Sequence, residues 1–326
     1  MQGTLKYAAA MVAERGIMNS EANLYNRGNP QEHLYNALAP VVPMVFEPPD
    51  PKREGCIIPD YMLLNLNGDS GFHFGRRGDF PGKYIGKPEN GDHHILICGG
   101  SGSGKSYATA KPTIHSWRSP IFAIDIKGEL LAEAKLMRRG VKVLDFTGER
   151  IRWKYDVFYF LSQDKKENLA QNVTELANSI IPMPMHVKET FWLESARNLL
   201  AGFIMHLYNL GMSFIESMEI IKTTSLTELM DKVCSGSDEI AKAFINPDVK
   251  ESPKMLAAIS EELRNNIRIF VTDPMIQQIL DTSDPSTKIV KWEDLERVDV
   301  FIRLNHRRLN QWGRVITLVH SRLNYR

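Results

Sequence analysis

The period of hydrophobic positions changes along the chain and divides it into two kinds of region. Residues 93–100, 120–125 and 141–146 are short apolar runs, most of them next to glycine or proline, which is typical of strands. A helix-compatible stretch separates the first two runs, and residues 129–140 show a helical pattern that ends at Gly140. This alternation predicts an α/β fold with parallel strands and right-handed crossovers.

A long helical region follows. From about residue 160, apolar residues recur near positions i, i+3, i+4 and i+7 in successive segments. Residues 298–304 then form an apolar run typical of a strand that returns to the sheet. The pattern predicts a helical subdomain, residues 160–285, inserted into an α/β domain built from residues 68–159 and 286–326.

The first part of the chain has neither pattern. Residues 1–60 resemble a short amphipathic helix followed by an irregular, proline-containing arm. Seven of the 22 glycines lie within residues 68–91, which predicts turns between short strands such as residues 61–66. We therefore treat residues 1–67 as an N-terminal arm with short strands.

Composition excludes several classes of protein. With 43% hydrophobic and 24% charged residues, the 326-residue chain is unlike a disordered, collagen-like or coiled-coil protein. Its net charge of +1 gives no overall positive field, so any contact with nucleic acid needs a local basic patch. Three cysteines argue against a disulfide framework. No apolar run approaches the roughly 20 residues that cross a bilayer, so we expect the chain itself to be soluble.

The most specific motif is the segment GGSGSGKS, which matches the phosphate-loop pattern G-x-x-x-x-G-K-[ST] between a predicted strand and a helix-compatible stretch. Glycines allow positive φ angles and point successive N–H groups toward an anion. Lys105 would reach the β- and γ-phosphates, and the Ser106 hydroxyl would bind Mg²⁺. We expect a site for ATP and Mg²⁺ formed by Gly99, Gly100, Ser101, Gly102, Ser103, Gly104, Lys105, Ser106 and Tyr107.

Hydrolysis would also need an acidic residue at the end of a neighbouring strand, to hold Mg²⁺ or to activate water. Asp125 ends one apolar run and is the first candidate, so the predicted catalytic residues are Lys105 and Asp125. Asp145 ends the next run and is the second candidate. Each acid is equally compatible with a simple polar position between a strand and its loop.

Other phosphate-loop classes fit less well. Asp145 to Gly148 resemble the D-x-x-G switch of GTP-binding proteins, but the sequence contains no N-K-x-D guanine motif, which argues against a GTPase. The helical region is too large for the arginine-bearing lid of a small-molecule kinase. A P-loop kinase and a non-hydrolysing nucleotide-binding scaffold stay open as alternatives.

The residues that follow the loop resemble one family in particular. A proline, a tryptophan and then an apolar strand ending in D-x-K-G-E are similar to the type IV secretion coupling proteins of the TraG/TraD type. Here these positions are Pro112, Trp117, Asp125, Lys127, Gly128 and Glu129, and Arg139-Gly140, Phe191-Trp192 and Ser195-Ala196-Arg197 also resemble the family. The similarity covers roughly residues 70 to 326.

The resemblance implies a RecA-like P-loop NTPase core with an inserted all-α domain. It implies a hexameric ring at the cytoplasmic face of the inner membrane, which uses ATP to pass single-stranded DNA and its bound relaxase to the channel proteins of a type IV secretion system. By the same resemblance, Lys105 and Ser106 contact phosphate and Mg²⁺, whereas Asp125, Lys127 and Glu129 lie near the nucleotide or a subunit boundary.

Two features of that family are missing from the 326 residues. These are the usual transmembrane segment and the Walker B strand, an apolar run that ends in Asp-Glu beyond the returning strand. We therefore expect the chain as given to bind ATP but to hydrolyse it inefficiently, because losing catalytic groups lowers the rate more than it lowers binding.

The end of the sequence is basic. After Asp299 there is no acidic residue, and arginines alternate with apolar residues; they are Arg303, Arg307, Arg308, Arg314, Arg322 and Arg326. Such a segment is either a helix that faces DNA or another subunit, or an amphipathic helix packed on the sheet, and we favour the packed helix.

Overall fold

The computed structural model describes residues 63–65, 68–76, 83–89, 94–100, 102–137, 140–149, 151–183 and 190–323. Residues 1–60, which form the first part of the predicted N-terminal arm (residues 1–67), lie outside them. The chain forms two compact units, Met1–Arg138 and Arg139–Arg326, and each is described by itself. The boundaries predicted at residues 67, 159 and 285 stay predictions. Within the described segments, no helix is long and apolar enough to cross a membrane.

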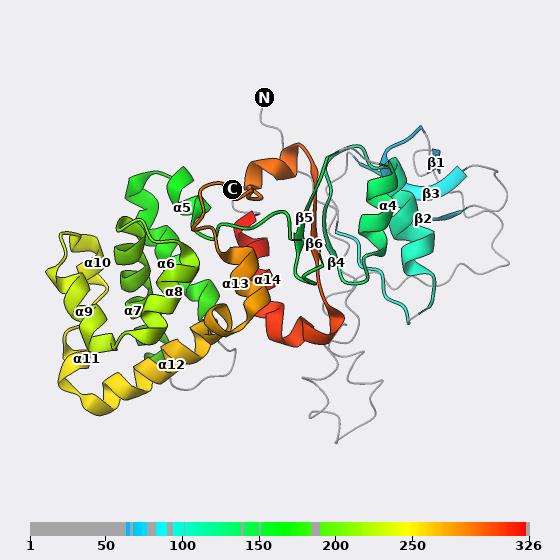
Figure 1. Ribbon diagram of the computed structural model, residues 1–326. Helices are drawn as coiled ribbons and strands as arrows, with labels where there is room; N and C mark the ends of the chain where they lie inside the picture. The colour runs from blue at the N-terminus through cyan, green and yellow to red at the C-terminus, as the bar shows by residue number, and fades with distance from the viewer. Residues whose placement is uncertain are drawn as a thin grey trace, which may run out of the picture. The chain divides into compact units, whose positions relative to one another are not determined.

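The first unit begins with a small antiparallel sheet of order β1-β3-β2 (Figure 1). Its strands are β1 (Leu63–Asn65), β2 (Gly71–Arg76) and β3 (Lys83–Pro88), which confirms the predicted short strands. Leu64 and His73 are buried on one face. Gly86 allows the strands to approach closely, because a Cβ there would lie 2.5 Å from the carbonyl oxygen of Phe72.

The helix that follows the phosphate loop packs on this sheet. It starts as the π-helical turn η2 (Ser106–Ala110) and continues into α3 (Lys111–Ser116). The backbone N–H of His73 donates to Thr113 Oγ1 at 3.0 Å, and His73 Nε2 lies 2.7 Å from Ser116 Oγ. Since all three side chains are buried, these contacts fix the position of α3 against β2.

The next two predicted elements are confirmed, but one strand prediction is wrong. β4 (Phe122–Asp125) and α4 (Glu129–Met137) form where the pattern predicts them. The strand predicted at residues 93–100 does not form over its described part, 94–100, where Leu96 is 86% exposed. An apolar run becomes a strand only when a neighbour accepts its backbone hydrogen bonds, and none of the described strands pairs with this one.

The second unit contains a parallel strand pair. β5 (Val141–Asp145) and β6 (Asp299–Arg303) lie side by side, with Val141 opposite Asp299 and Asp145 opposite Arg303. Both strands were expected, the second as the strand that returns to the sheet. The α/β class with parallel strands is therefore confirmed.

The helices of this unit fall between the two strands in sequence. They are α5 (Tyr159–Gln163), α6 (Leu169–Ile180), α7 (Phe191–Asn209), α8 (Phe214–Thr223), α9 (Leu226–Ser235), α10 (Glu239–Ala243), α11 (Asp248–Glu251), α12 (Pro253–Thr272) and α13 (Pro274–Leu280). α7 is buried over most of its length, since α6, α8, α9, α10 and α12 all contact it. Figure 1 shows α6–α12 gathered in one group, coloured from green to yellow, and α13 in orange next to α14.

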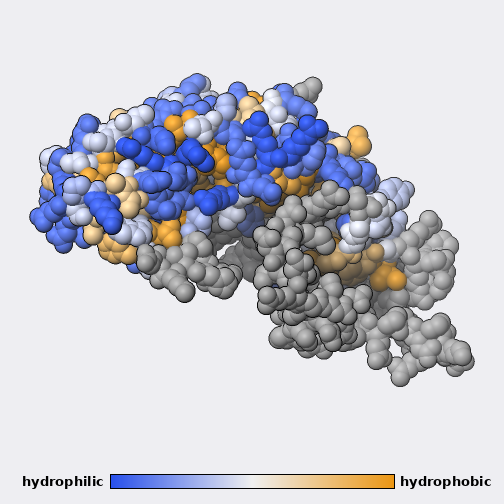
Figure 2. All heavy atoms as spheres, turned by 90° about the horizontal axis from the view of Figure 1, so that it is seen from below, coloured by the Kyte–Doolittle hydropathy of each residue, from blue (hydrophilic) through white to orange (hydrophobic). Residues whose placement is uncertain are grey.

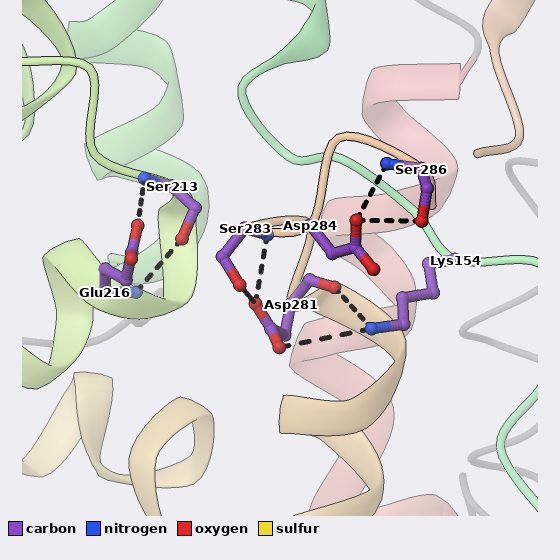
Figure 3. A network of polar contacts seen from close by, with 7 residues as sticks. All are labelled: Lys154, Ser213, Glu216, Asp281, Ser283, Asp284 and Ser286. Atoms are coloured by element: carbon purple, nitrogen blue, oxygen red, sulfur yellow. Dashed lines mark hydrogen bonds and ion pairs between the residues drawn. The ribbon is translucent and has the colours of Figure 1, made fainter. Parts of the chain in front are cut away.

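The two connections between the strands and the helices run together. The Lys154 N–H donates to the Lys288 carbonyl, and the Val290 N–H donates to the Lys154 carbonyl, both at 2.9 Å. Lys154 Nζ donates to the Asp281 carbonyl at 2.7 Å and lies 4.0 Å from Asp281 Oδ2 (Figure 3). The segments before and after the helices are thus joined by backbone and side-chain contacts.

The basic end packs as an amphipathic helix, which is the alternative that the sequence favoured. α14 (Leu309–Leu323) buries Trp312, Val315 and Val319, and the Trp312 ring centroid lies 5.8 Å from that of Phe146. Its exposed positions are mainly polar and include Asn310, Gln311, Arg314 and Thr317.

Figure 2 shows one face of the protein, where hydrophilic side chains dominate and apolar ones form small patches.

Candidate nucleotide-binding site

Glycine determines the shape of the phosphate loop. Gly102 and Gly104 have φ angles of +79° and +85°, which residues with a side chain rarely adopt. A Cβ at either position would meet nothing within 4 Å, so backbone conformation and not crowding requires glycine there. Successive N–H groups in such turns form an anion-binding nest before a helix. The described part of the loop therefore fits a phosphate group; Ser101 lies outside it.

The side chain of Lys105 folds back over this loop. Its Nζ donates to the carbonyl oxygens of Gly99 at 2.5 Å and Gly100 at 2.7 Å, and it lies 3.4 Å from Ser103 Oγ. The positive charge is thus held beside the loop backbone. A phosphate bound by the loop would replace these carbonyl contacts, because an anion is the stronger partner of an ammonium group.

The π-helical turn after Lys105 has a cause in the sequence. The Lys111 N–H donates to the carbonyl of Ser106, five residues earlier. Pro112 lacks the N–H that an α-helix would direct to the Ala108 carbonyl, and its ring also crowds that carbonyl. The helix widens at this point, as such turns often do at functional sites.

Two threonines hold the inner side of the turn. Thr109 Oγ1 donates to the Lys105 carbonyl at 2.5 Å, and Thr113 Oγ1 donates to the Thr109 carbonyl at 2.7 Å. Ser106, the predicted Mg²⁺ ligand, is half-buried at the start of the turn. Tyr107 lies on the outside and is 80% exposed.

Asp125 organises the turn from β4 into α4. Its Oδ1 accepts the Gly128 N–H and its Oδ2 accepts the Leu131 N–H, both at 2.8 Å, and the residue is 3% exposed. Gly128 has φ +77°, so the turn itself requires glycine. Lys127 and Glu129 are exposed beside it. These bonds give Asp125 a structural role, while its predicted catalytic role stays a prediction.

Glu133 joins α4 to α3, a contact that the sequence analysis missed. Its Oε1 lies 2.5 Å from His115 Nε2, and its Oε2 lies 3.5 Å from Lys111 Nζ. The hydrogen bond with His115 is the main cause that lowers the pKa of Glu133. Only the packing of α3 against α4 reveals this contact, since nothing in the spacing of the three residues indicates it.

The second candidate acid, Asp145, belongs to the second unit and is paired there. Its Oδ2 lies 3.4 Å from Arg303 Nη1, which also donates to Glu149 Oε2 at 2.7 Å. Its Oδ1 accepts the Thr147 N–H at 3.0 Å. The hydrogen bond with Glu149 is the largest effect on the pKa of Arg303 and raises it; burial acts in the opposite direction, and the charge of Asp145 raises it further. The segment that resembles a D-x-x-G switch is therefore a salt-bridged turn.

Other arginines of the basic end are also bound within their unit. Arg308 Nη1 donates to Asp273 Oδ2 at 3.2 Å, and Trp312 Nε1 donates to the same oxygen at 2.9 Å. Arg314 Nη1 donates to Asn266 Oδ1 at 2.7 Å. These contacts fix α14 to the helices that precede it. Two arginines of the basic end therefore have structural partners within their own unit.

Comparison with known proteins identifies the family to which the chain belongs. The sequence profile of the family described as type IV secretory system conjugative DNA transfer matches residues 51–322. The chain belongs to this family. The predicted resemblance to the coupling proteins is thereby confirmed. No curated protein matches the chain.

Solved structures of coupling proteins are similar over part of their length. The unbound bacterial conjugative coupling protein TrwBdeltaN70 is 15% identical, with a TM-score of 0.49, and the match covers 67% of this chain and 47% of that one. The plasmid coupling protein TrwB with ADP and Mg²⁺ is 17% identical, with a TM-score of 0.47 and coverages of 67% and 48%. TrwB with an ATP analogue is 16% identical, with the same TM-score and coverages. The chain thus spans about half the length of these proteins.

Proposed function

We propose that this member of the family binds ATP and Mg²⁺ and contributes to a motor that passes single-stranded DNA, with its relaxase, to a type IV secretion channel. The observation that supports nucleotide binding is the loop itself: two glycines at positive φ, followed by Lys105, whose Nζ lies 2.5 Å from the Gly99 carbonyl oxygen. Bound ATP would supply the phosphoanhydride bond whose hydrolysis drives transport.

The residues of the loop have separate roles in this proposal. The backbone N–H groups of residues 100–104 hold the phosphates, and Lys105 exchanges its carbonyl contacts for the β- and γ-phosphates. Ser106 binds Mg²⁺ through its hydroxyl. Asp125 holds α4. A catalytic role for Asp125 requires that its substitution slow ATP hydrolysis by more than its effect on folding explains.

The proposed architecture is a RecA-like core with an inserted all-α domain. Helices α5–α13 fall between β5 and β6, and the connections at Lys154 and Ile289 pair with each other, as expected for a domain inserted at one place in a sheet. Assembly as a hexameric ring at the cytoplasmic face of the inner membrane, beside the channel proteins, rests on membership of the family.

Two measurements test the proposal. Mg-ATP at 100 times its dissociation constant stabilises a protein by about 2.7 kcal/mol, so we expect a clear rise in melting temperature that Lys105→Ala abolishes. Absence of any rise in the parent chain would refute the nucleotide site. Phosphate release measured with malachite green, with and without single-stranded DNA, then tests the motor.

One observation favours a second candidate function. Both carboxylate oxygens of Asp125 hold backbone amides, which is expected of a structural acid in a non-hydrolysing nucleotide-binding scaffold. Tight ATP binding with no phosphate release, even with DNA, would support the scaffold. A P-loop kinase would instead consume ATP only after a phosphate acceptor is added.

A further inference from the structure

We propose that Tyr107 binds the nucleoside part of the nucleotide and so supplies affinity that the phosphate loop cannot. The inference rests on the proposed nucleotide site and deepens it, because it assigns a contact for the base and ribose. It concerns one exposed aromatic side chain, two residues after Lys105, at the start of the helix that the loop leads into.

The packing of η2 sets the direction of this side chain. Thr109 is buried on the inner side, where its hydroxyl donates to the Lys105 carbonyl at 2.5 Å. Residues two positions apart in a helical turn lie on nearly opposite sides of it, so Tyr107 faces away from the core. Its 80% exposure agrees with this placement, and the helix cannot turn it inward without exposing Thr109.

The ring of Tyr107 contrasts with the other aromatic rings of its unit. Phe72 and Phe74 have ring centroids 5.5 Å apart, and His73 and Tyr84 have centroids 5.2 Å apart. Trp117 and Phe122 are buried. Over the described part of this unit, Tyr107 is the most exposed of the phenylalanine, tyrosine and tryptophan side chains, so its ring is accessible to a ligand.

The chemistry of the loop leaves room for such a contact. The loop amides and Lys105 are positioned to bind phosphate oxygens, and they make no contact with the base or the ribose. An aromatic ring beside the loop stacks on a base, an interaction that typically changes affinity by roughly 5- to 150-fold. Every base has a π face, so a stacking residue separates nucleotides from inorganic phosphates but discriminates little between ATP and GTP.

The test compares Mg-ATP with Mg-tripolyphosphate, which has the phosphates but no nucleoside. Isothermal titration calorimetry on the full chain would use the parent, Tyr107→Ala, Tyr107→Phe and Leu136→Ala. Leu136 is the matched control, because it is 81% exposed on α4 in the same unit. We expect Tyr107→Ala to weaken ATP roughly tenfold and to leave tripolyphosphate unchanged. Tyr107→Phe should keep the affinity for ATP, and Leu136→Ala should change neither ligand.

Each outcome has one meaning. Equal weakening of ATP and tripolyphosphate in Tyr107→Ala, or no weakening of ATP, would overturn the role of Tyr107 while leaving the phosphate site intact. Failure of both ligands to bind the parent chain would refute the proposed function itself. Melting temperatures of the free variants show whether Tyr107→Ala is folded. If it is not, Tyr107→Leu, which removes the ring but keeps an apolar side chain, carries the same test.

Discussion

Arg303 lies opposite Asp145 in the parallel β5–β6 pair and shares one guanidinium nitrogen between that carboxylate and Glu149. The two residues are 158 positions apart in sequence, and the helices α5–α13 are formed by the chain between them. Asp145 is buried, and the cation beside its carboxylate is Arg303, which follows the helical region in sequence. This pair is the polar contact that closes the strand pair at its carboxyl end.

Removal of Arg303 is expected to destabilise the second unit. Arg303→Ala leaves the buried Asp145 carboxylate without its cation, which should lower the free energy of unfolding by about 2–4 kcal/mol. Arg307→Ala is the matched control, because Arg307 is exposed just beyond the same strand and should change stability by less than about 0.5 kcal/mol. Urea denaturation measures both. Equal effects of the two substitutions would show that the pair contributes nothing specific.

Asp125 provides a second test, which separates folding from chemistry. Asp125→Ala removes the acceptor of two backbone amides and should cost about 1–3 kcal/mol in the free energy of unfolding. Glu129→Gln, at an exposed position next to the same turn, should be nearly neutral. We expect Asp125→Ala to bind Mg-ATP nearly as well as the parent at low temperature, as judged by calorimetry. Lost binding in a fully folded variant would contradict the structural role.

Much of this fold is predictable from the sequence, because its elements follow from local periodicity. The strands at 122–125, 141–145 and 299–303 carry mostly apolar residues at their buried positions, the exceptions being Asp125, Asp145 and Asp299. Residues 95–98 have the same local pattern but form no strand, since a strand also depends on a neighbour that donates and accepts its hydrogen bonds. Local composition contains no information about that neighbour.

The roles of individual acids were less predictable for the same reason. Asp125 and Asp145 look alike in sequence, as each ends an apolar run. One binds amides three and six residues ahead, and the other binds a distant arginine. The glycines of the phosphate loop could be assigned from sequence, because positive φ is a property of the residue itself and not of a partner.

Acid should destabilise the first unit through His73. Burial is the largest effect on its pKa and lowers it from 6.5, while the charge of Asp69 acts in the opposite direction. A histidine whose pKa is lower in the folded chain contributes its full stability above about pH 6.5 and loses it as the pH falls toward the folded pKa. Burial also lowers the pKa values of His206 and His320 in the second unit, in the same sense.

Melting curves between pH 5 and pH 8 measure this dependence. We expect the parent chain to lose stability as the pH falls below about 6.5, and His73→Phe to lose less, because phenylalanine takes up no proton. The hydrogen bond to Ser116 is also lost in this variant, so its stability at pH 8 should be lower than that of the parent. His94→Gln, at an exposed position, should keep the parental profile. An unchanged profile in His73→Phe would assign the acid sensitivity to other groups.

Two glycines of the second unit should respond to alanine in opposite directions. Gly148 has φ +80°, and a Cβ there would lie 2.6 Å from Met275 Sδ. Both the strained backbone and the contact oppose a side chain, so Gly148→Ala should lower the free energy of unfolding by about 1–3 kcal/mol. Gly313 lies inside α14, and a Cβ there would meet nothing within 4 Å, so Gly313→Ala should raise the free energy of unfolding by about 0.5–1 kcal/mol. Urea denaturation of the two variants measures both changes.

The double variant Gly148→Ala with Met275→Ala separates the two causes at the first position. Removing the long side chain of Met275 relieves the contact but not the backbone strain. The cost of Gly148→Ala measured in the Met275→Ala background should therefore fall to the cost of the positive φ alone, roughly 1–2 kcal/mol. If that cost is the same in both backgrounds, Met275 moves freely and the turn after β5 is limited only by its own conformation. A neutral Gly148→Ala in the parent chain would contradict both causes, because neither the positive φ nor the contact would then oppose a side chain.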